Sequence, residues 1–250
     1  MNTILLEHQE GIGIIRLNRP QVHHAIDGPT MEALQHAVSQ FNADASIRAV
    51  MLATTGGETF CAGGDLRYFA TLRTHEAGRQ MSRTMQAILM QIEEAPKPYI
   101  AAIQGNAFGG GCELALACHF RVMAEGKHFA FRQVANGIIT GWGGGRRLFR
   151  LVPPAVALHW LTTAQPVDAV ELHRRGVVHE VVAPDTVEER SRELAKRILQ
   201  MPEAAVQAIL RLYRNAMEGD WAAFAELETE LFADLWVSPF FRNFLERWVK

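Results

Sequence analysis

Cysteine, serine and long hydrophobic runs are scarce in this chain of 250 residues. The three cysteines have no CxxC spacing and no histidine at zinc-ligand spacing, which favours a reduced, cytoplasmic protein without a disulfide framework. No apolar run approaches the roughly 18 residues of a membrane helix. The first residues carry neither the basic segment nor the small-residue cleavage site of a secretory signal. A membrane-spanning or secreted protein is therefore not expected.

Charge of one sign and the common nucleotide motifs are also missing. The 25 Lys and Arg nearly balance the 27 Asp and Glu, which argues against nucleic acid as the main partner. The arginine pairs at 146–147 and 174–175 are too short for a basic patch and are interpreted as solvated helix faces. A P-loop, a dinucleotide-binding GxGxxG after a strand and a GxSxG motif are all absent. The pair His23-His24 lacks further ligands, so no metal site is expected.

Hydrophobic patterning predicts an α/β protein whose first half alternates strands and helices. Strands are expected in four short apolar or β-branched runs, at 12–17, 49–53, 99–103 and 120–124. Helices are expected from Pro29, over 80–94 and from Leu114, and then over 153–163, 168–174, 185–200, 202–217 and 220–236. No Ser/Gly/Pro-rich linker separates the halves. One continuous domain is therefore expected, with a core over residues 1–190 and a helical extension over 191–250.

Thirteen of the 20 glycines lie in three short stretches, at 56–64, 105–111 and 137–145. The first two stretches each follow a buried strand and precede a helix. Glycine allows a ligand to approach the backbone, and the first amides of a helix are unpaired. Two such amides that converge on one point would hold a developing oxyanion. Each loop taken alone also fits an ordinary strand-to-helix turn.

Five segments occur along the chain in this order: IIRLNRPQVHHAI, FCAGGDL, QGNAFGGGCELALACHFRVMAE, FRQVANGIITGWGGGRRLFRLV and PVDAVELHRRGVVHEVV. Over essentially the whole chain they resemble the crotonase superfamily, the enoyl-CoA hydratase/isomerase enzymes. The resemblance implies an α/β fold, a crotonase-like spiral of ββα units with a C-terminal helical trimerisation region. It implies an acyl-CoA thioester as substrate, no separate cofactor, no nucleic-acid or membrane partner, and a homotrimer or dimer of trimers.

The resemblance also assigns catalytic roles. The oxyanion amides fall on Gly64 and Gly110, the positions that the loop chemistry already favours. Glu113 matches the first catalytic glutamate of the family, although the helix dipole alone favours an acid there. The dipole lowers the pKa of this carboxyl and burial raises it, and either effect can dominate. Gln133 stands where hydratases carry a second glutamate; a glutamine orients a water molecule but transfers no proton.

The missing second acid leaves three functions open. The first is a hydratase-type lyase with an altered site. The second is decarboxylation of a malonyl-type thioester such as ethylmalonyl- or methylmalonyl-CoA, in which loss of CO₂ forms the enolate and one acid reprotonates it. Around Trp142 the run GIITGWGGG resembles the loop of ethylmalonyl-CoA decarboxylases, and Arg132 would steer a substrate carboxylate. The third is a catalytically weak protein that binds CoA esters or acts in an assembly.

Other residues are expected to contact the substrate. Three of them belong to the first oxyanion loop: Ala62, Asp65 and Leu66. The segment 66–78 and the C-terminal helices are expected to form the acyl pocket. His24 replaces the usual asparagine of the adenine-side loop. Four basic residues are expected to meet the CoA phosphates: Arg19, Arg242, Arg247 and Lys250.

Overall fold

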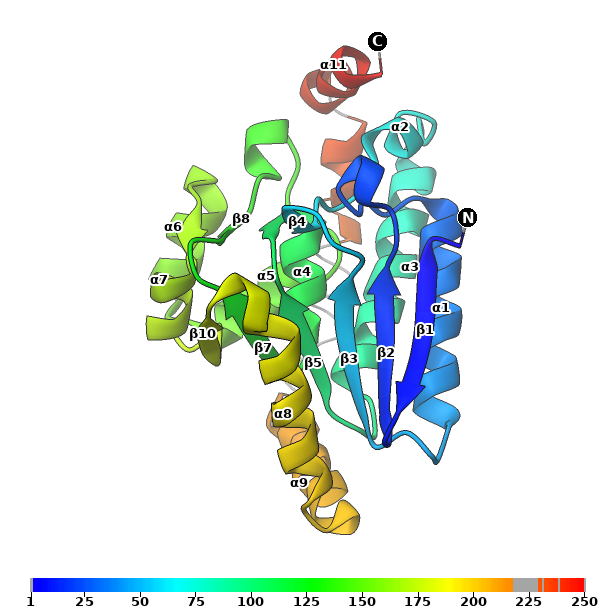
Figure 1. Cartoon of the computed structure of the whole chain (residues 1–250). Helices are drawn as coiled ribbons and strands as arrows, with labels where there is room; N and C mark the ends of the chain where they lie inside the picture. The colour runs from blue at the N-terminus through cyan, green and yellow to red at the C-terminus, as the bar shows by residue number, and fades with distance from the viewer. Residues whose placement is uncertain (1, 218–228, 231, 238, 250) are drawn as a thin grey trace.

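The computed structural model describes residues 2–217, 229–230, 232–237 and 239–249. It contains two β-sheets, of which the larger has six strands. Its order is β1 (Ile4–Gln9), β2 (Ile12–Leu17), β3 (Ala49–Thr54), β5 (Tyr99–Ile103), β7 (Phe120–Ala124) and β10 (Glu180–Val182). Only β1 and β2 pair antiparallel in this sheet, and the other neighbours pair parallel (Figure 1).

The smaller sheet has four strands, which lie side by side in the order in which they occur along the chain. It consists of β4 (Thr59–Cys61), β6 (Asn106–Phe108), β8 (His128–Ala130) and β9 (Val167–Asp168). The first three strands are parallel, and β9 is antiparallel to β8. The pairs β3–β4, β5–β6 and β7–β8 each send one strand to each sheet before the chain enters a helix. This is the repeated ββα unit that the resemblance implies.

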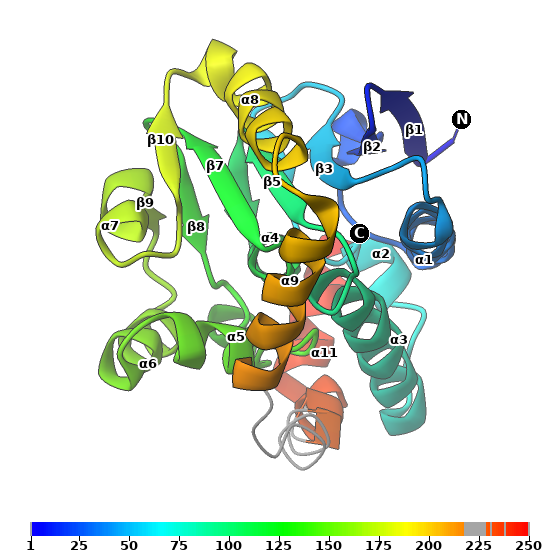
Figure 2. The same ribbon diagram turned by 90° about the horizontal axis from the view of Figure 1, so that it is seen from below.

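Helices cover both faces of the larger sheet, which explains why β5 and all of β3 except its last residue, Thr54, are apolar, with every residue buried. One face packs against α8 (Val187–Leu199), which contacts β3, β5 and β7. The other face belongs to the main core, which includes residues of α1 (Gly28–Ala43), α3 (His75–Glu93) and α4 (Gly110–Ala117). Figures 1 and 2 show α8 on the opposite side of the sheet from these helices.

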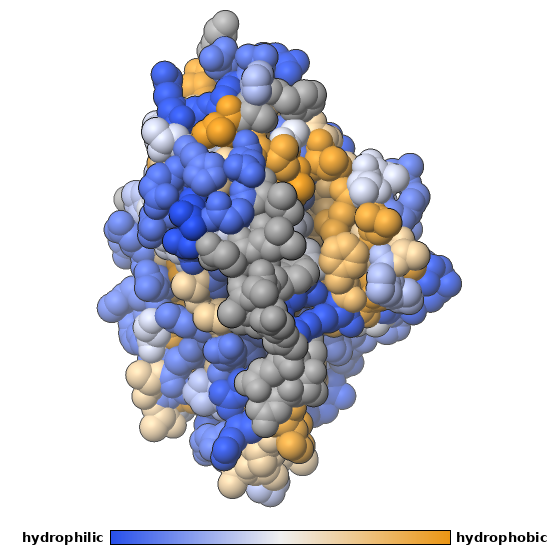
Figure 3. All heavy atoms as spheres, turned by 180° about the vertical axis from the view of Figure 1, so that it is seen from behind, coloured by the Kyte–Doolittle hydropathy of each residue, from blue (hydrophilic) through white to orange (hydrophobic). Residues whose placement is uncertain are grey.

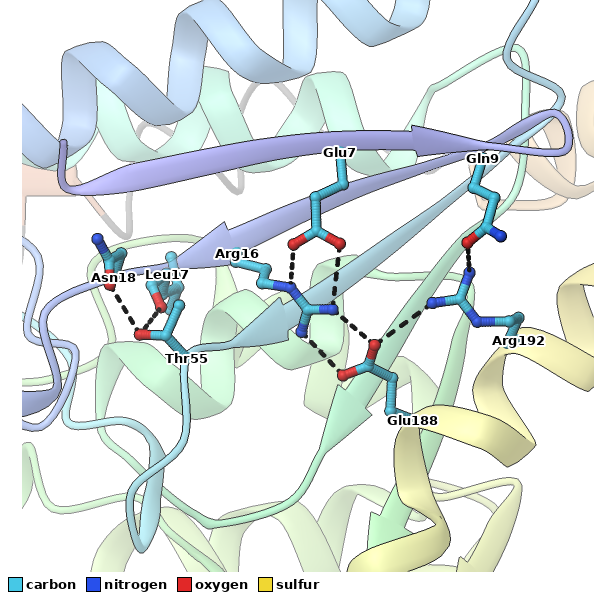
Figure 4. Close-up of polar contacts among 8 residues, drawn as sticks. All are labelled: Glu7, Gln9, Arg16, Leu17, Asn18, Thr55, Glu188 and Arg192. Atoms are coloured by element: carbon cyan, nitrogen blue, oxygen red, sulfur yellow. Dashed lines mark hydrogen bonds and ion pairs between the residues drawn. The ribbon is translucent and has the colours of Figure 1, made fainter.

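A polar cluster fastens α8 to the first two strands (Figure 4). Arg16 of β2 donates to Glu188 of α8 at 2.6 and 2.8 Å and to Glu7 of β1 at 2.5 Å. Arg192 reaches Glu188 and Gln9 at 3.4 Å. The expected boundary at residue 190 therefore lies inside a helix that packs on the sheet, and the division of the chain there stays a prediction.

The four predicted strands are present, whereas β1 and the short strands were not predicted. β2, β5 and β7 have the expected bounds, and β3 extends to Thr54. The pattern missed β4, β6 and β8 because three residues are too few to show a period. α3 begins at His75 rather than residue 80, because Thr74 accepts a hydrogen bond from the Ala77 amide at 3.1 Å and caps the helix. α4 begins at Gly110 rather than Leu114.

The second half of the chain is mainly helical, as predicted. It contains α5 (Gly144–Leu151), α6 (Pro154–Thr163), α7 (Ala169–Arg174), α8, α9 (Glu203–Met217) and α11 (Pro239–Trp248). α11 packs on the short α2 (Leu66–Phe69) near the top of Figure 1. Of the predicted helix 220–236, residues 220–228 and 231 lie outside the described residues, and the others are helical. Within the described part of the chain, no helix is long and apolar enough to cross a membrane.

Candidate active site

The carboxyl ends of β4, β6 and β8 meet at one edge because these strands are parallel neighbours. The three loops that leave them, with α4 and the segment before α5, line one pocket. It brings together eight predicted site residues: Ala62, Gly64, Leu66, Gly110, Glu113, Arg132, Gln133 and Trp142. Asp65, His24 and Arg19 are not in its lining.

Two residues that line this pocket have backbone amides that are unpaired within the described part of the chain. Neither the Gly64 nor the Gly110 N–H has a hydrogen-bond partner among the described residues. The loops that carry them touch, because a Cβ on Gly63 would lie 2.9 Å from the Gly110 nitrogen. Gly63 also has φ +90°, which a residue with a side chain rarely adopts. Glycine is therefore required where the two donors approach each other.

The Glu113 carboxylate lies in the pocket wall, in the first turn of α4, and is 2% exposed. Its Oε2 accepts hydrogen bonds from the amides of Trp142 at 2.7 Å and Gly144 at 2.8 Å. Its Oε1 accepts from Gln133 Nε2 at 2.9 Å and from the Gly141 amide at 3.4 Å. Burial raises the pKa of Glu113, and the N–H donors oppose this effect without cancelling it.

Gln133 occupies the expected second position and presents one polar atom with no partner. Its Nε2 faces Glu113, as the donor end of an amide must when it meets a carboxylate. Its Oε1 is buried and has no hydrogen-bond partner among the described residues. An acceptor of this kind suits a water molecule or a hydroxyl group of a ligand.

Aromatic side chains close the apolar side of the pocket. Phe69, Phe232 and Phe241 line it, and all three pack on the fully buried Trp236 with ring centroids 4.7, 5.2 and 5.1 Å away. The first of these follows Leu66 in α2, and the others come from the C-terminal helices. The structure thus brings together the two segments that were expected to form the acyl pocket.

A sequence model described as enoyl-CoA hydratase/isomerase matches residues 7–246. The chain belongs to this family. It is 34% identical to a crotonyl-CoA hydratase of Syntrophomonas wolfei, over 92% of this chain and 88% of that protein. It is 30% identical to a short-chain-enoyl-CoA hydratase of Clostridium acetobutylicum, over 94% and 89%. The predicted resemblance is confirmed, and the protein belongs to a lyase and isomerase family.

Solved structures confirm the fold of this family member. The enoyl-CoA hydratase of Bacillus anthracis is 32% identical and superimposes with a TM-score of 0.83, over 94% of this chain and 90% of that one. An enoyl-CoA hydratase/isomerase of Mycobacterium paratuberculosis superimposes with a TM-score of 0.92 over 99% and 98%. At 22% identity the second likeness concerns the fold alone.

Asp65 and Arg19 do not line the pocket and instead support the loop that carries Gly64. Asp65 caps α2 by accepting a hydrogen bond from the Arg67 amide at 3.0 Å. Arg19 forms ion pairs with Asp65 at 3.0 Å and Asp27 at 2.8 Å. In this arrangement both side chains hold the loop that presents Gly64.

His24 is buried away from the pocket, with 1% of its surface exposed. Its Nδ1 accepts from the Arg19 amide at 3.2 Å, so its Nε2 carries the proton and donates to the Gly56 carbonyl at 2.9 Å. Burial lowers the pKa of His24, which keeps the ring neutral. The structure therefore does not place His24 in the pocket lining, and its two hydrogen bonds join two loops, so its contact with the substrate stays a prediction.

The other basic residues differ in their surroundings. Arg132 is exposed at the pocket mouth, and its guanidinium has no partner among the described residues. Arg242 donates to the Leu72 carbonyl at 3.0 Å, and Arg247 bonds within its own helix. Lys250 lies outside the described residues. Contact of these bases with CoA phosphates stays a prediction.

The interpretation of Arg146 and Arg147 as a solvated face is wrong. They are 7% and 2% exposed, and both pair with the buried Glu93 at the end of α3, at 3.1 and 2.9 Å. The carboxylate of Glu93 makes the burial of the two charges possible. The second arginine pair is correctly placed at the surface, where both members bond to Glu171.

Sequence reasoning missed the polar side chains of α3 that support the site. Ser82, Gln86 and Glu93 are buried and lie on one face of α3, at spacings of four and seven residues. The same face carries the apolar stripe of this amphipathic helix. Polar residues inside an apolar stripe were the available signal, since such groups need buried partners.

Proposed function

We propose that this enzyme adds water to the double bond of a short enoyl-CoA and catalyses the reverse dehydration. The main support for this proposal is the composition of the pocket wall. Glu113 lies there beside the loops of Gly64 and Gly110, and the Oε1 atom of Gln133 is an acceptor without a partner among the described residues. The relatives named crotonyl-CoA hydratase and short-chain-enoyl-CoA hydratase support a short unsaturated acyl group.

The proposed chemistry needs one proton-transferring group. A water molecule donates hydrogen bonds to Glu113 and to Gln133 Oε1, which leaves its lone pair directed at the β-carbon. As the new C–O bond forms, Glu113 takes the water proton and the double-bond electrons move onto the thioester oxygen. The Gly64 and Gly110 amides stabilise this enolate. Glu113 then returns the proton to the α-carbon, and the 3-hydroxyacyl thioester leaves.

Decarboxylation of a malonyl-type thioester is the second candidate. Its support is the free guanidinium of Arg132 at the mouth, together with the apolar lining from Ile138, Ile139 and Trp142. The polar wall opposes it, because Glu113 and Gln133 Oε1 are both acceptors. A substrate carboxylate next to them would meet like charge and an unpaired oxygen, whereas water or a β-hydroxyl would satisfy both.

Assays with an enoyl-CoA and with a malonyl-type thioester test directly which reaction the enzyme catalyses. Hydration of crotonyl-CoA, followed by loss of absorbance of the conjugated double bond, should far exceed release of CO₂ from ethylmalonyl- or methylmalonyl-CoA. Faster CO₂ release would instead establish the decarboxylase. Calorimetric binding of a CoA thioester without any turnover would leave only a binding protein, and absence of binding would contradict all of these functions.

The pH dependence of hydration should show a single ionisation on the acidic side. Burial penalises the charged form of Glu113 and raises its pKa above the ordinary 4.5. The base exists only above that pKa, so kcat/KM should fall as the pH drops through it. Gln133 does not titrate and adds no second ionisation. Rates from about pH 4 to pH 9 measure this, and a profile with two carboxyl ionisations would contradict a single proton-transferring glutamate.

The matched variants of this prediction change Gln133. In Gln133→Glu two carboxyl groups would lie about as close as the present 2.9 Å contact and would share a proton, which supplies both an acid and a base. Hydration should then rise toward about 10²-fold, the low end for one acid–base group, and a second ionisation should appear. Gln133→Met keeps the length, removes the acceptor and should lower hydration. No gain with glutamate would favour decarboxylation.

A homo-oligomer is proposed from apolar side chains that are exposed on the surface. Apolar side chains gather on the outer side of α5 and α6, where Phe149 and Leu158 are exposed, and α9 exposes Ile209 and Leu212 (Figure 3). These exposed apolar side chains support a homotrimer or dimer of trimers. A molecular mass of one chain in sedimentation equilibrium would refute this assembly.

Three buried free thiols support a cytoplasmic location. Since two amides polarise the carbonyl, no cofactor besides the CoA of the substrate is proposed.

A further inference from the structure

The peptide unit between Gly141 and Trp142 is hydrogen-bonded at both ends. Its carbonyl, on Gly141, accepts from Ser82 Oγ at 2.5 Å and from Gln86 Nε2 at 3.1 Å. Its N–H, on Trp142, donates to Glu113 Oε2 at 2.7 Å. A single rigid amide group therefore connects α3 to the proton-transferring carboxylate.

We propose that this peptide unit is a relay through which Ser82 and Gln86 act as positioning residues for Glu113. Donors to a carbonyl polarise the whole amide and strengthen its N–H as a donor. A stronger N–H donor to a carboxylate favours the ionised form. The two side chains would thus set both the orientation and the proton affinity of Glu113 without touching the substrate.

The next carbonyl of the loop is fixed in a similar way. Arg147 Nη1 donates to the Trp142 carbonyl at 2.9 Å, and the same guanidinium pairs with Glu93 at 2.9 Å. Glu93 ends α3, the helix that also carries Ser82 and Gln86. Two successive carbonyls are therefore held by groups that α3 supplies or anchors, which fixes the plane of the amide whose N–H holds Glu113.

The proton affinity of the Glu113 carboxylate depends more on its N–H donors than on the ionisable groups nearby. Among the described residues, the nearby titratable or charged groups are Cys112 with its neighbour Cys61, Arg132 at the pocket mouth, and Glu93 with Arg146 and Arg147 next to the loop. Burial raises the pKa of Cys61 to about 12 and that of Cys112 well above its ordinary value, so both thiols stay neutral. The carboxylate of Glu93 is paired with the two arginines.

The test measures the pKa of Glu113 in Ser82→Ala. Titration of ¹³C-labelled glutamate carboxyl groups by NMR gives this pKa, with the resonance assigned from Glu113→Gln. Loss of one donor to the relay should raise it by about half a unit, as expected for a modest cooperative change in one hydrogen bond. The acidic limb of kcat/KM should move equally, so that activity lost at low pH returns at higher pH. Only this kinetic readout rests on the proposed hydration, because the NMR titration needs no turnover.

Matched variants separate the relay from simple packing. Ser191→Ala removes another fully buried serine, which donates to the Val187 carbonyl inside α8 at 2.8 Å, and should leave the Glu113 pKa unchanged. Ser82→Cys keeps a weak donor and should give an intermediate shift. Gln86→Met removes the second donor and decides the matter where Ser82→Ala does not fold. An unchanged Glu113 pKa in a folded Ser82→Ala or Gln86→Met protein would overturn the relay.

Discussion

Replacing Glu113 with glutamine is expected to lower kcat for crotonyl-CoA hydration by about 10²–10⁴-fold, the contribution typical of a positioned proton-transfer group. Glutamine keeps the size of the side chain but takes no proton from water. Among the described residues that line the pocket, Arg132 is the other charged side chain, and a guanidinium offers hydrogen-bond donors but no acceptor. Nothing else in the wall replaces Glu113. Binding of the thioester should persist, since the Gly64 and Gly110 amides remain.

The control for this variant is Glu125→Gln, the same chemical change at an exposed position at the end of β7. It should leave kcat, thioester binding and the thermal unfolding temperature near their original values. Steady-state rates and calorimetry on both variants provide the comparison. Turnover by Glu113→Gln within about threefold of the unchanged enzyme would show that the proton comes from elsewhere.

The fold was predictable wherever one element carried its own period or run. β5 was found with its bounds because five consecutive apolar residues suit a strand buried on both faces, and β7 because four of its five residues are apolar, the exception being Arg121. β4, β6 and β8 have three residues each and draw their stability from neighbouring strands far apart in sequence. Pairing of that kind leaves no local trace, so only the resemblance indicated a second layer of strands.

The site was predictable to the extent that its chemistry lies in the backbone. Glycines at 63, 64 and 110 had to allow close approach, and that requirement is visible in the sequence as clustering. The support of Glu113 by Ser82, Gln86 and Arg147 left a weaker trace, because a polar residue on a helix looks the same whether it faces water or a buried carbonyl. Arg147 was misjudged because its burial depends on Glu93, 54 residues away in the chain.

The third glycine stretch has acquired a specific structural task. Amides of Gly141, Trp142 and Gly144 all point at the Glu113 carboxylate. Gly144 leaves no room for a side chain, since a Cβ there would lie 2.3 Å from Glu113 Cγ. The stretch therefore holds the carboxylate that both the proposed hydration and the alternative decarboxylation use.

Adding a methyl group at Gly110 is expected to lower kcat by about 10²–10³-fold, corresponding to about 2.7–4 kcal/mol for one oxyanion donor. A Cβ at this position would lie 2.3 Å from the six-membered ring of Trp142. That ring is 3% exposed, and its indole N–H contacts Met81 Sδ at 3.4 Å, so it has little freedom to withdraw. Either the Gly110 amide moves away from the substrate oxygen, or Trp142 moves and loosens its hold on Glu113.

A double-mutant cycle with Trp142→Phe identifies this clash as the cause. The smaller ring of phenylalanine removes the atoms that the new methyl group meets and keeps the backbone N–H that binds Glu113. Gly110→Ala combined with Trp142→Phe should therefore be more active than the product of the two single losses predicts, with the recovery in kcat rather than KM. Thermal unfolding of all four proteins accounts for any loss of folded enzyme. Strictly additive losses would mean that the methyl group acts through some other contact, because residues that clash directly must be energetically coupled.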